Sequence, residues 1–545
     1  MFHRVSFSVS PLVAAPELVP LDVQSLRAPL EVPLPTIRFD APPFVAKDGW
    51  LDETVDTIEK HYFQADASMG DYRKPPMALV RCSRGGKTRA LFEITRAFRT
   101  RHANCAVIFI SFNDQTMVKD WEQADPVGAI CRRIAFAAWK GGNTFDQFCS
   151  TYSVDSNDII RWLGKSFCLL LIDELNQLST FQSTSNRAGS GFTVANFIKE
   201  HFLLPQNRFL VFSSHVLSTT GELTAYMETA SSRQVILREL PLIPSLQVAK
   251  NNFNWQDLNA REVLYYGKVP ALIYEARWEA QEMGHLPTAK RNQAIRDCVS
   301  GGFVTEEGIR KLFTTFLTGN VGGVFPPLLQ LMTTVSQDHI QWIPFHMMAA
   351  LETFSCEHGL KRLEAIVRLF HAFKEAKVSS GDGWESLFVA VLLIRCWSQS
   401  SDECILPFVI GETCTFSYNE PFNGNFATQR VAEFLTGIQP PSSFPHVAVY
   451  YPAHASFPCY DVIVAHYDPW EVRRLYGYQL KEGKAPPKEG AMSDFERSFV
   501  IRGEAARMTG MGNDWVRPSA DGINAFFGVS GQHWTPQEWK KLGGL

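Results

Sequence analysis

The sequence lacks three features that would assign its 545 residues to a special class of protein. No run of about 18 apolar residues occurs, so no membrane-spanning helix is predicted. The 11 cysteines form no C-x-x-C pair and no cluster with histidine, which argues against a disulfide framework and against a zinc site. The net charge of -4 provides no global positive field, so any contact with nucleic acid requires a local basic patch.

Length and composition predict several folded domains. With 45% hydrophobic and 20% charged residues the composition is that of a globular protein. The length exceeds the roughly 100–200 residues that one domain usually holds. Changes in composition divide the chain into a Pro-rich leader (1–45), a first α/β domain (46–290), a helical region (291–402) and a second α/β domain (403–545).

Strand-like runs alternate with helical stretches in the first α/β domain. A helix is expected over 87–101, and the helical region contains a long amphipathic run at 359–376. Strands that alternate with helices indicate a mainly parallel sheet covered on both faces. The expected strands are 77–82, 106–112, 168–174, 208–214 and 234–240.

The segment CSRGGKT (82–88) follows the first of these strands and opens the helix, as a phosphate-binding loop does. In such loops glycines let backbone N–H groups surround the phosphates, lysine reaches the β- and γ-phosphates, and the final hydroxyl binds Mg²⁺. Arg81 stands where the usual pattern has its first glycine, and its side chain is expected either to reshape the loop or to contact phosphate. The predicted nucleotide-binding residues here are Ser83, Arg84, Gly85, Gly86, Lys87 and Thr88, with Thr88 also a magnesium ligand.

A second motif, LLLIDE (169–174), makes the first more specific. It predicts a buried strand that ends in two carboxylates. Asp173 would hold Mg²⁺ through water, and Glu174 would polarise the attacking water. The alternative is a helix N-cap that follows a core strand. Ser214, at the end of the next strand, is expected beside the γ-phosphate in a sheet ordered as in AAA+ and related signalling ATPases.

Near the C-terminus, the segment from CYDVIVAHYD to YGYQLKEG (459–483) predicts a hairpin with the chemistry of a metal-dependent nuclease. Gln479 and Lys481 lie two apart on one strand and share a face, and Asp461 on the preceding strand can lie opposite them. This is the PD-(D/E)xK arrangement, with a glutamine at the usual acidic position. Asp461 and Gln479 are the predicted metal ligands, and Lys481 is expected near the attacking water. Glu433, on an expected helix, is the candidate for a further carboxylate.

The alternative for these residues is an ordinary amphipathic hairpin with outward polar groups, and for Glu433 a surface acid. Two observations favour a nuclease: apolar residues occupy the alternate positions Tyr478 and Leu480, and basic residues cluster directly after the hairpin. Such a local cationic surface suits a phosphate backbone. Its members are Lys484, Lys488, Arg497, Arg502 and Arg507.

Taken as a set, these motifs resemble those of Crinkler-type proteins. The resemblance rests on LVRCSRGGKTRAL (79–91), LLLIDELNQL (169–178), FPCYDVIVAHYDPW (457–470), GYQLKEGK (477–484) and FFGVSGQHWTPQEW (526–539). It implies a P-loop ATPase of the AAA+ or signal-transducing class joined to a C-terminal nuclease of the restriction-endonuclease superfamily. It also implies a secreted effector that enters a host cell and its nucleus. The ubiquitin-like header of secreted members is not recognisable, and the Pro-rich leader stands in its place.

The sequence therefore predicts an ATP- or GTP-hydrolysing switch that uses Mg²⁺ and is coupled to a DNA-cleaving domain, acting as an effector toxin. The predicted catalytic residues are Glu174, Asp461, Gln479, Lys481 and Glu433. Two alternatives stay open. The C-terminal domain could bind nucleic acid or a host protein without cleaving, because Gln479 carries no charge. The chain could also be an ATPase scaffold with an unrelated tail, which predicts no affinity for DNA. An oligomer is compatible with each.

Overall fold

The fold comes from a computed structural model, and all structural statements refer to the residues that it describes. No helix in these segments has the length and apolar character needed to span a bilayer. The described residues are 18–37, 43–63, 74–81, 85–182, 194, 196–214, 235–280, 305–320, 332–334, 340–358, 362–376, 381–402, 404–411, 414–419, 438–451, 460–481, 495–503 and 515–543.

The first α/β domain contains the predicted parallel sheet. Its strands lie in the order β3–β5–β6–β2–β7, and each neighbouring pair is parallel. The strand that precedes the phosphate-binding loop, β2, therefore lies between β6 and β7, with β5 next to β6. The strands are β2 (Met77–Val80), β3 (Ala106–Ser111), β5 (Cys168–Asp173), β6 (Arg208–Ser214) and β7 (Ile236–Arg238).

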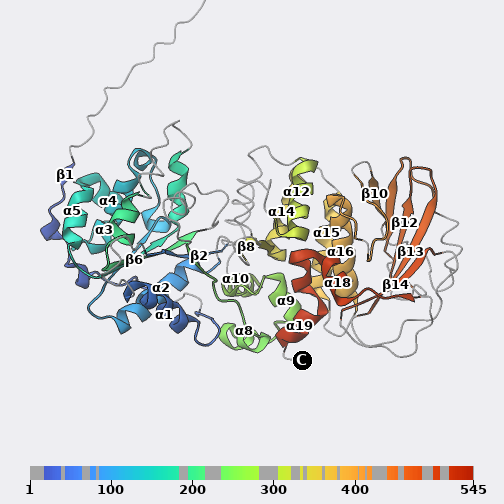
Figure 1. The fold of residues 1–545 in the computed structure, drawn as a ribbon, viewed down its shortest axis with the longest axis horizontal. Coiled ribbons are helices and arrows are strands. Elements are labelled where there is room, and N and C mark those ends of the chain that lie inside the picture. Colours follow the sequence, from blue (N-terminus) through green and yellow to red (C-terminus); the bar gives the residue numbers. More distant parts are fainter. Residues whose placement is uncertain are drawn as a thin grey trace, which may run out of the picture.

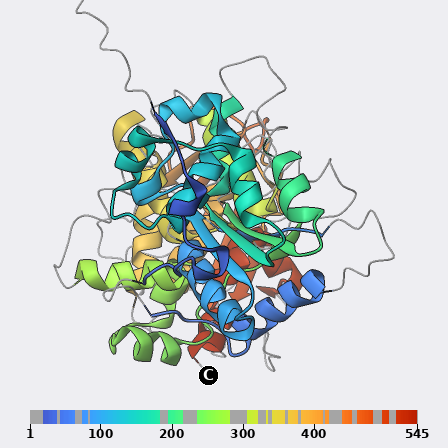
Figure 2. The same cartoon turned by 90° about the vertical axis from the view of Figure 1, so that its left-hand side faces the viewer.

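Helices cover both faces of this sheet, as its buried strands require. In β2, Ala78 and Val80 belong to one hydrophobic cluster, whereas Met77 and Leu79 belong to another. The first cluster includes α3 and α5, and the second includes α1 and α2; the two pairs lie on opposite sides of the sheet (Figure 1), and Figure 2 looks onto this end of the molecule. The helices are α1 (Trp50–Phe63), α2 (Lys87–Arg101), α3 (Pro126–Ala138), α4 (Phe145–Thr151) and α5 (Ser156–Leu163).

Part of the Pro-rich leader packs against this domain. In residues 18–37, the short strand β1 (Val19–Pro20) pairs with β4 (Tyr152–Ser153). Leu26 and Val32 are buried in the same cluster as α3 and α5. The leader residues after position 17 thus extend the core of the first domain, although their composition alone suggests an extended segment or a flexible tail.

The helical region and the second sheet share one hydrophobic core rather than forming separate cores. This core also contains helices that the sequence assigns to the first domain, and the last helices of the chain return to it, with α19 beside α9 (Figure 1). The helices are α8 (Leu246–Phe253), α9 (Ala260–Tyr265), α10 (Pro270–Ala280), α12 (Glu306–Thr318), α14 (Pro344–His358), α15 (Arg362–Glu375), α16 (Asp382–Ser398), α18 (Ala520–Gly531) and α19 (Pro536–Gly543). A small hairpin, β8 (Met332–Thr334) with β9 (Ile340–Trp342), lies in the same region.

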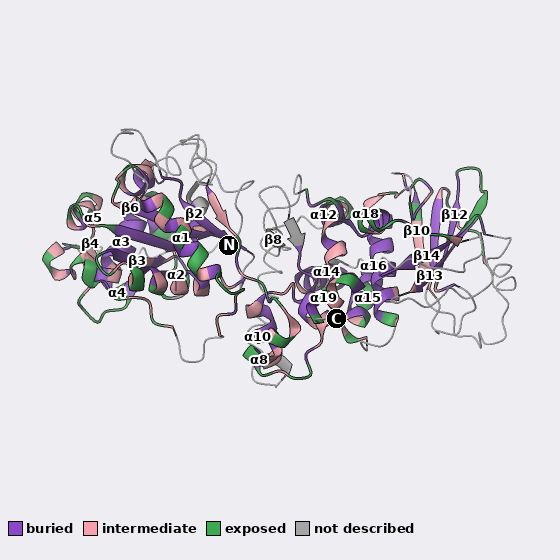
Figure 3. Cartoon of the chain, turned by 60° about the horizontal axis from the view of Figure 1, so that its bottom comes forward, coloured by how far each residue is buried: buried purple, intermediate pink, exposed green. Residues whose placement is uncertain are grey.

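The second sheet has six strands in sequence order, from β10 to β15. The pairs β11–β12 and β12–β13 are antiparallel, and the other neighbouring pairs are parallel. The buried strands of both sheets are visible in Figure 3. The strands are β10 (Thr415–Asn419), β11 (His446–Tyr450), β12 (Val462–Tyr467), β13 (Arg473–Lys481), β14 (Arg497–Arg502) and β15 (Trp515–Val516).

Helix α16 joins the helical region to this sheet. Its Phe388 ring lies 5.4 Å from the ring of Tyr478 on β13 and 4.8 Å from that of Phe526 on α18. The buried Arg395 guanidinium donates to the carbonyls of Phe526 and Ala525, which ties α16 to α18. The change in composition near 398–402 therefore marks the end of a core helix.

A buried ion cluster fixes the segment that follows β3. The fully buried Glu122 carboxylate accepts hydrogen bonds from Arg133 on α3 at 2.9 Å and from Arg132 at 3.1 Å. Arg133 also donates to the carbonyls of Thr116 and Met117. Burial raises the pKa of Glu122, but the hydrogen bonds and charge of Arg133 outweigh burial and leave the pKa below its ordinary value.

We expect Glu122→Gln to destabilise the first domain by about 3–5 kcal/mol at pH 7, because it leaves the buried Arg133 guanidinium without its counter-charge, whereas Arg132 keeps Asp125. The carboxyl pKa is lower in the folded chain than in the unfolded chain, so this contribution is present above about pH 4.3 and is lost as the pH falls through the folded pKa. Urea unfolding at a series of pH values measures the difference. The control Asp56→Asn removes an exposed partner of Arg101 and should cost less than about 1 kcal/mol; an equal effect of both changes would contradict the account.

Candidate nucleotide site and candidate nuclease site

The end of the phosphate-binding loop adopts the geometry that its glycines predict. Gly86 has a φ of +85° and directly precedes α2, a left-handed conformation that favours glycine. A Cβ built at this position meets no atom within 4 Å, so open space faces the loop. The N-terminal end of α2 carries positive dipole charge, which suits an anion. Ser83 and Arg84 lie outside the described residues, and their predicted phosphate contacts remain predictions.

The predicted magnesium pair, Thr88 and Asp173, lies together at the carboxyl edge of the first sheet. The Thr88 hydroxyl donates to Asp173 Oδ2 at 2.7 Å, and the Ser213 hydroxyl donates to Oδ1 at 2.6 Å. The Ser111 hydroxyl lies 3.4 Å from Oδ2. Burial raises the pKa of Asp173; the Ser213 hydrogen bond opposes the shift, and the charge of Glu174 adds to it. Oxygen donors of this kind fit Mg²⁺.

Lys87 and Glu174 form a buried ion pair beside these residues. Lys87 Nζ lies 3.4 Å from Glu174 Oε1 and donates to the carbonyl of Arg81 at 3.1 Å. Glu174 has a φ of +58°, a conformation that costs a non-glycine residue about 1–3 kcal/mol. Its backbone N–H donates to the Ser213 hydroxyl at 2.9 Å, which helps to hold that conformation. The predicted phosphate lysine and the predicted catalytic acid are therefore in contact.

The role of Arg81, which the sequence leaves open, is structural within the described residues. Its guanidinium donates to the carbonyl of Gly85 at 3.2 Å, to that of Pro241 at 3.0 Å and to that of Leu240. The side chain is 3% exposed. Arg81 thus links the phosphate-binding loop to the segment after β7. These contacts favour the expectation that Arg81 reshapes the loop over the expectation that it contacts phosphate directly.

Ser213 contacts both carboxylate residues, and the predicted position of Ser214 beside the γ-phosphate remains a prediction. Ser214 lies one position further along β6, where its carbonyl accepts from the backbone N–H of Arg81 at 3.4 Å. Sequence reasoning did not predict that Ser213 and Ser111 both reach Asp173. The available signal is positional: both are polar residues at the carboxyl ends of parallel strands, where ligands of such sheets usually bind.

An apolar cavity of about 40 Å³ adjoins the loop. Gly85 and Gly86 line one side of it, Leu240 and Pro241 another, and Pro270 and Ala271 at the start of α10 a third. Arg81 and Arg89 also line it. The cavity brings an element of the shared core into contact with the phosphate-binding loop.

The predicted nuclease residues also come together. Strands β12 and β13 pair antiparallel with Val462 opposite Tyr478, so Asp461 lies opposite Gln479, as predicted. The Asp461 Oδ2 atom accepts the backbone N–H of Leu480 at 2.6 Å. Tyr478 and Leu480 face the shared core, and by alternation Gln479 and Lys481 face the other side of the sheet.

This second site is incomplete as a metal centre in the part of the chain that the structure describes. No group of three or more His, Cys, Asp or Glu residues there could hold a metal ion. Glu433, the candidate for a further carboxylate, lies outside the described residues. Gln479 is 1% exposed and contributes no charge. One carboxylate and one amide are a weak ligand set for Mg²⁺ compared with the oxygen cluster around Asp173.

Neither a protein-family model nor a curated protein matches the sequence. Similar solved structures include a Walker-type ATPase of Pyrococcus abyssi (12% identity, 59% of this chain and 99% of that chain, TM-score 0.33). AMPPCP-bound DnaA from Aquifex aeolicus is also similar (12% identity, 65% and 84% of the chains, TM-score 0.26). So is the Thermotoga maritima RuvB branch migration motor (13% identity, 54% and 92%, TM-score 0.26). The P-loop-type arrangement of the first α/β domain follows from its own strand order and contacts.

We expect Arg81→Gly, which restores the usual loop pattern, to destabilise the first domain by about 2–4 kcal/mol because three carbonyl groups lose a charged donor. The stability of Arg81→Lys should lie between that of the wild type and that of Arg81→Gly, since lysine keeps the charge but not the planar guanidinium. Thermal unfolding of the three proteins measures the effect. Unchanged or higher stability of Arg81→Gly would mean that the arginine only replaces a glycine.

Proposed function

We propose that the first domain binds and hydrolyses ATP or GTP with Mg²⁺. The observation that carries this proposal is the convergence of Lys87, Thr88, Asp173 and Glu174 at the carboxyl edge of one parallel sheet. These residue types come from two motifs about 85 residues apart, and each stands where phosphoryl-transfer chemistry requires it. An unrelated helix cap would not need the paired hydroxyl and lysine contacts.

Each residue has a defined role in this proposal. Thr88 and Asp173 would hold Mg²⁺, which neutralises phosphate charge when bound. Lys87 exchanges its contact with Glu174 for the β- and γ-phosphates, and Glu174 is then released to orient the attacking water. Ser213 keeps Asp173 and the Glu174 backbone in place throughout. The base would lie against the apolar residues that border the small cavity between the loop and α10.

We expect Lys87→Ala and Asp173→Asn each to lower the rate of nucleotide hydrolysis by about 100-fold or more, because each removes a charge that stabilises the transition state. Release of inorganic phosphate from ATP and from GTP measures the rate. The control Arg96→Ala removes a charge from the exposed face of the same helix and should leave the rate unchanged. Hydrolysis that survives in Lys87→Ala at the wild-type rate would place the activity elsewhere.

We propose further that the C-terminal domain cleaves DNA with Mg²⁺ and that nucleotide controls it. The support is the shared position of Asp461, Gln479 and Lys481 at the ends of β12 and β13. The alternative is a domain that binds nucleic acid or a host protein without cleaving. The weak metal ligand set among the described residues favours that alternative, so cleavage is the step that most needs a test.

A chain of contacts supports the proposed coupling. Pro270 and Ala271 line the nucleotide cavity, and the turn just before them contains Lys268. Lys268 Nζ lies 3.4 Å from Glu538 of α19, the last helix of the chain. The Arg261 guanidinium of α9 stacks 4.6 Å above the Trp539 ring on the same helix. If α10 moves when nucleotide binds, the adjoining turn with Lys268 would move with it. The contact of Lys268 with Glu538 would then transmit this movement to α19.

The proposed biological role is that of a Crinkler-type effector toxin, secreted and acting in a host nucleus, with DNA and host proteins as partners. Its support is the set of motifs that resemble that family, most of which surround the two sites. The proposed biochemistry does not depend on the route of delivery.

We expect the purified chain to nick plasmid DNA with Mg²⁺ but not with EDTA, and Lys481→Ala to abolish nicking because the lysine near the attacking water is lost. The control Arg474→Ala removes an exposed charge near the opposite end of the strand that carries Lys481 and should leave nicking within about threefold, since it changes only a screened surface charge. Lys87→Ala in the same assay tests coupling, and an unchanged response at every nucleotide concentration would contradict it. Absence of nicking in all lanes, with DNA still bound, would support the binding alternative.

A further inference from the structure

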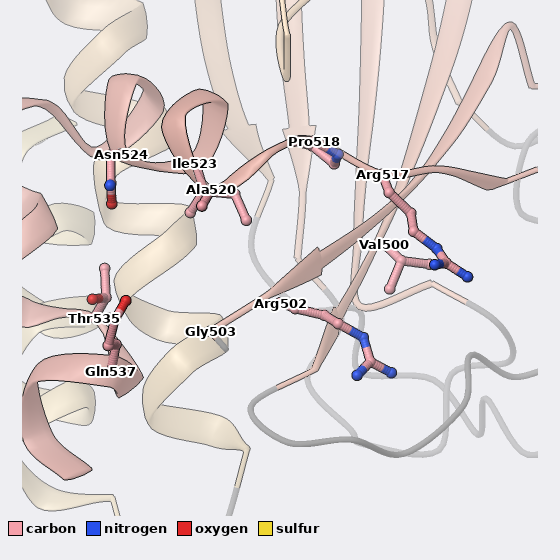
Figure 4. Close-up of a pocket in the computed structure, with 10 residues that line it drawn as sticks. All are labelled: Val500, Arg502, Gly503, Arg517, Pro518, Ala520, Ile523, Asn524, Thr535 and Gln537. Carbon is pink, nitrogen blue, oxygen red and sulfur yellow. The ribbon is translucent and has the colours of Figure 1, made fainter. Parts of the chain in front are cut away.

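A second cavity, of about 100 Å³, lies where the carboxyl ends of β14 and β15 meet α18 and α19 (Figure 4). Arg502 ends β14, and Arg517 directly follows β15. The polar side chains of Asn524, Thr535 and Gln537 line the cavity from the helices. No described residue that lines it is acidic. Neither proposed chemistry uses this cavity.

The strand register places the two arginines beside the candidate nuclease residues. In the parallel pair β13–β14, Arg502 lies opposite Lys481, and the backbone N–H of Gly503 donates to the Lys481 carbonyl at 3.1 Å. In the pair β14–β15, Phe499 lies opposite Val516, so Arg517 lies next to Val500. Val500 and Arg502 share one face of the sheet with Gln479 and Lys481. The cationic residues Lys481, Arg502 and Arg517 thus lie on the same face of the second sheet, at the carboxyl ends of β13, β14 and β15.

The two charged residues that line the cavity, Arg502 and Arg517, have the same sign. Arg502 is 7% exposed, and burial together with the positive charge of Arg517 lowers its pKa. Figure 4 shows both arginine side chains extending from the strands in the same direction. The 12-residue helix α18 begins at Ala520 in the cavity lining, and its N-terminal dipole adds positive potential, although Ser519 already caps the Gly522 N–H. Two like charges that line one cavity, of which Arg502 is buried, are stabilised when an anion binds between them.

We propose that Arg502 and Arg517 form a phosphate-binding subsite that holds one phosphate group of a DNA strand beside Asp461 and Lys481. Guanidinium forks match phosphate oxygens, and the neutral hydroxyl and amide groups of the cavity supply further donors. The proposal deepens the proposed DNA chemistry and rests on it for the source of the phosphate. The subsite binds either a phosphate within the strand or one at a strand end, and it fixes which phosphodiester bond reaches Lys481.

The test is the affinity of the full chain for a short fluorescent DNA duplex, measured by anisotropy in EDTA over a range of salt concentrations. Arg502→Gln and Arg517→Gln should each weaken binding about tenfold and reduce the slope of log affinity against log salt by about one. Arg474→Gln, an exposed charge near the start of β13, is the matched control and should change affinity by less than about threefold. Arg517 is exposed, so its substitution tests the subsite even if Arg502→Gln fails to fold.

Two further arms separate the outcomes. Duplexes with a 5′-phosphate or a 5′-hydroxyl are compared: an arginine effect confined to the phosphorylated duplex identifies a strand end, and an equal effect identifies an internal phosphate. Calorimetry with inorganic phosphate uses the Lys87→Ala chain, so that the phosphate-binding loop does not contribute. If both arginine variants bind DNA as the wild type does, the subsite is overturned. If no chain binds DNA but phosphate binding still needs Arg502 and Arg517, the anion site stands and the proposed DNA function is overturned.

Discussion

The buried Asp173 carboxylate is the group on which the first domain's site depends. Hydroxyl groups from α2, β6 and β3 converge on it, through Thr88, Ser213 and Ser111. Burial raises its pKa, whereas the hydrogen bonds from Ser213 and Thr88 and the charge of Lys87 favour its charged form. A carboxylate held in this way by oxygen-bearing neighbours is poised to bind a cation. The same contacts orient Glu174, because Ser213 also accepts the Glu174 backbone N–H. The contacts around Asp173 therefore position the predicted magnesium ligands, and they also orient Glu174, which pairs with Lys87.

The second constraint is the hydrophobic core that runs from the edge of the nucleotide cavity to the second sheet. Val45 and the helices α8 to α10 belong to that core, and so do β13, α18 and α19. Cores of this density do not deform smoothly, so a shift at one boundary is passed on as a discrete movement of packed elements. The contact of Lys268 with Glu538 lies on this route, between the nucleotide cavity and the helix that borders the arginine-lined cavity. A nucleotide-controlled C-terminal domain requires a physical connection of this kind.

Local patterns in the sequence predict much of this arrangement. Apolar runs locate β2, β3, β5, β6 and β7, the charged periodic segment locates α2 at its observed bounds, and two-residue alternation places Asp461 opposite Gln479. The remaining features depend on contacts between distant segments, which periodicity does not encode. Arg81 binds carbonyl groups 159 and 160 positions away, and α19 packs against α9. The contact of Ser213 with Asp173 depends on the register of β6 beside β5, which residue type does not encode.

The account's central claim is that the Asp173 cluster is a magnesium–nucleotide site. The most direct measurement is equilibrium binding of fluorescent ATP and GTP analogues to the full chain, with Mg²⁺ and with EDTA, beside Thr88→Val. The account predicts saturable binding that weakens at least about tenfold when Mg²⁺ is removed, and a Thr88→Val chain that no longer responds to Mg²⁺. Binding of neither analogue by the folded wild-type chain, or binding indifferent to both Mg²⁺ and Thr88, would contradict it.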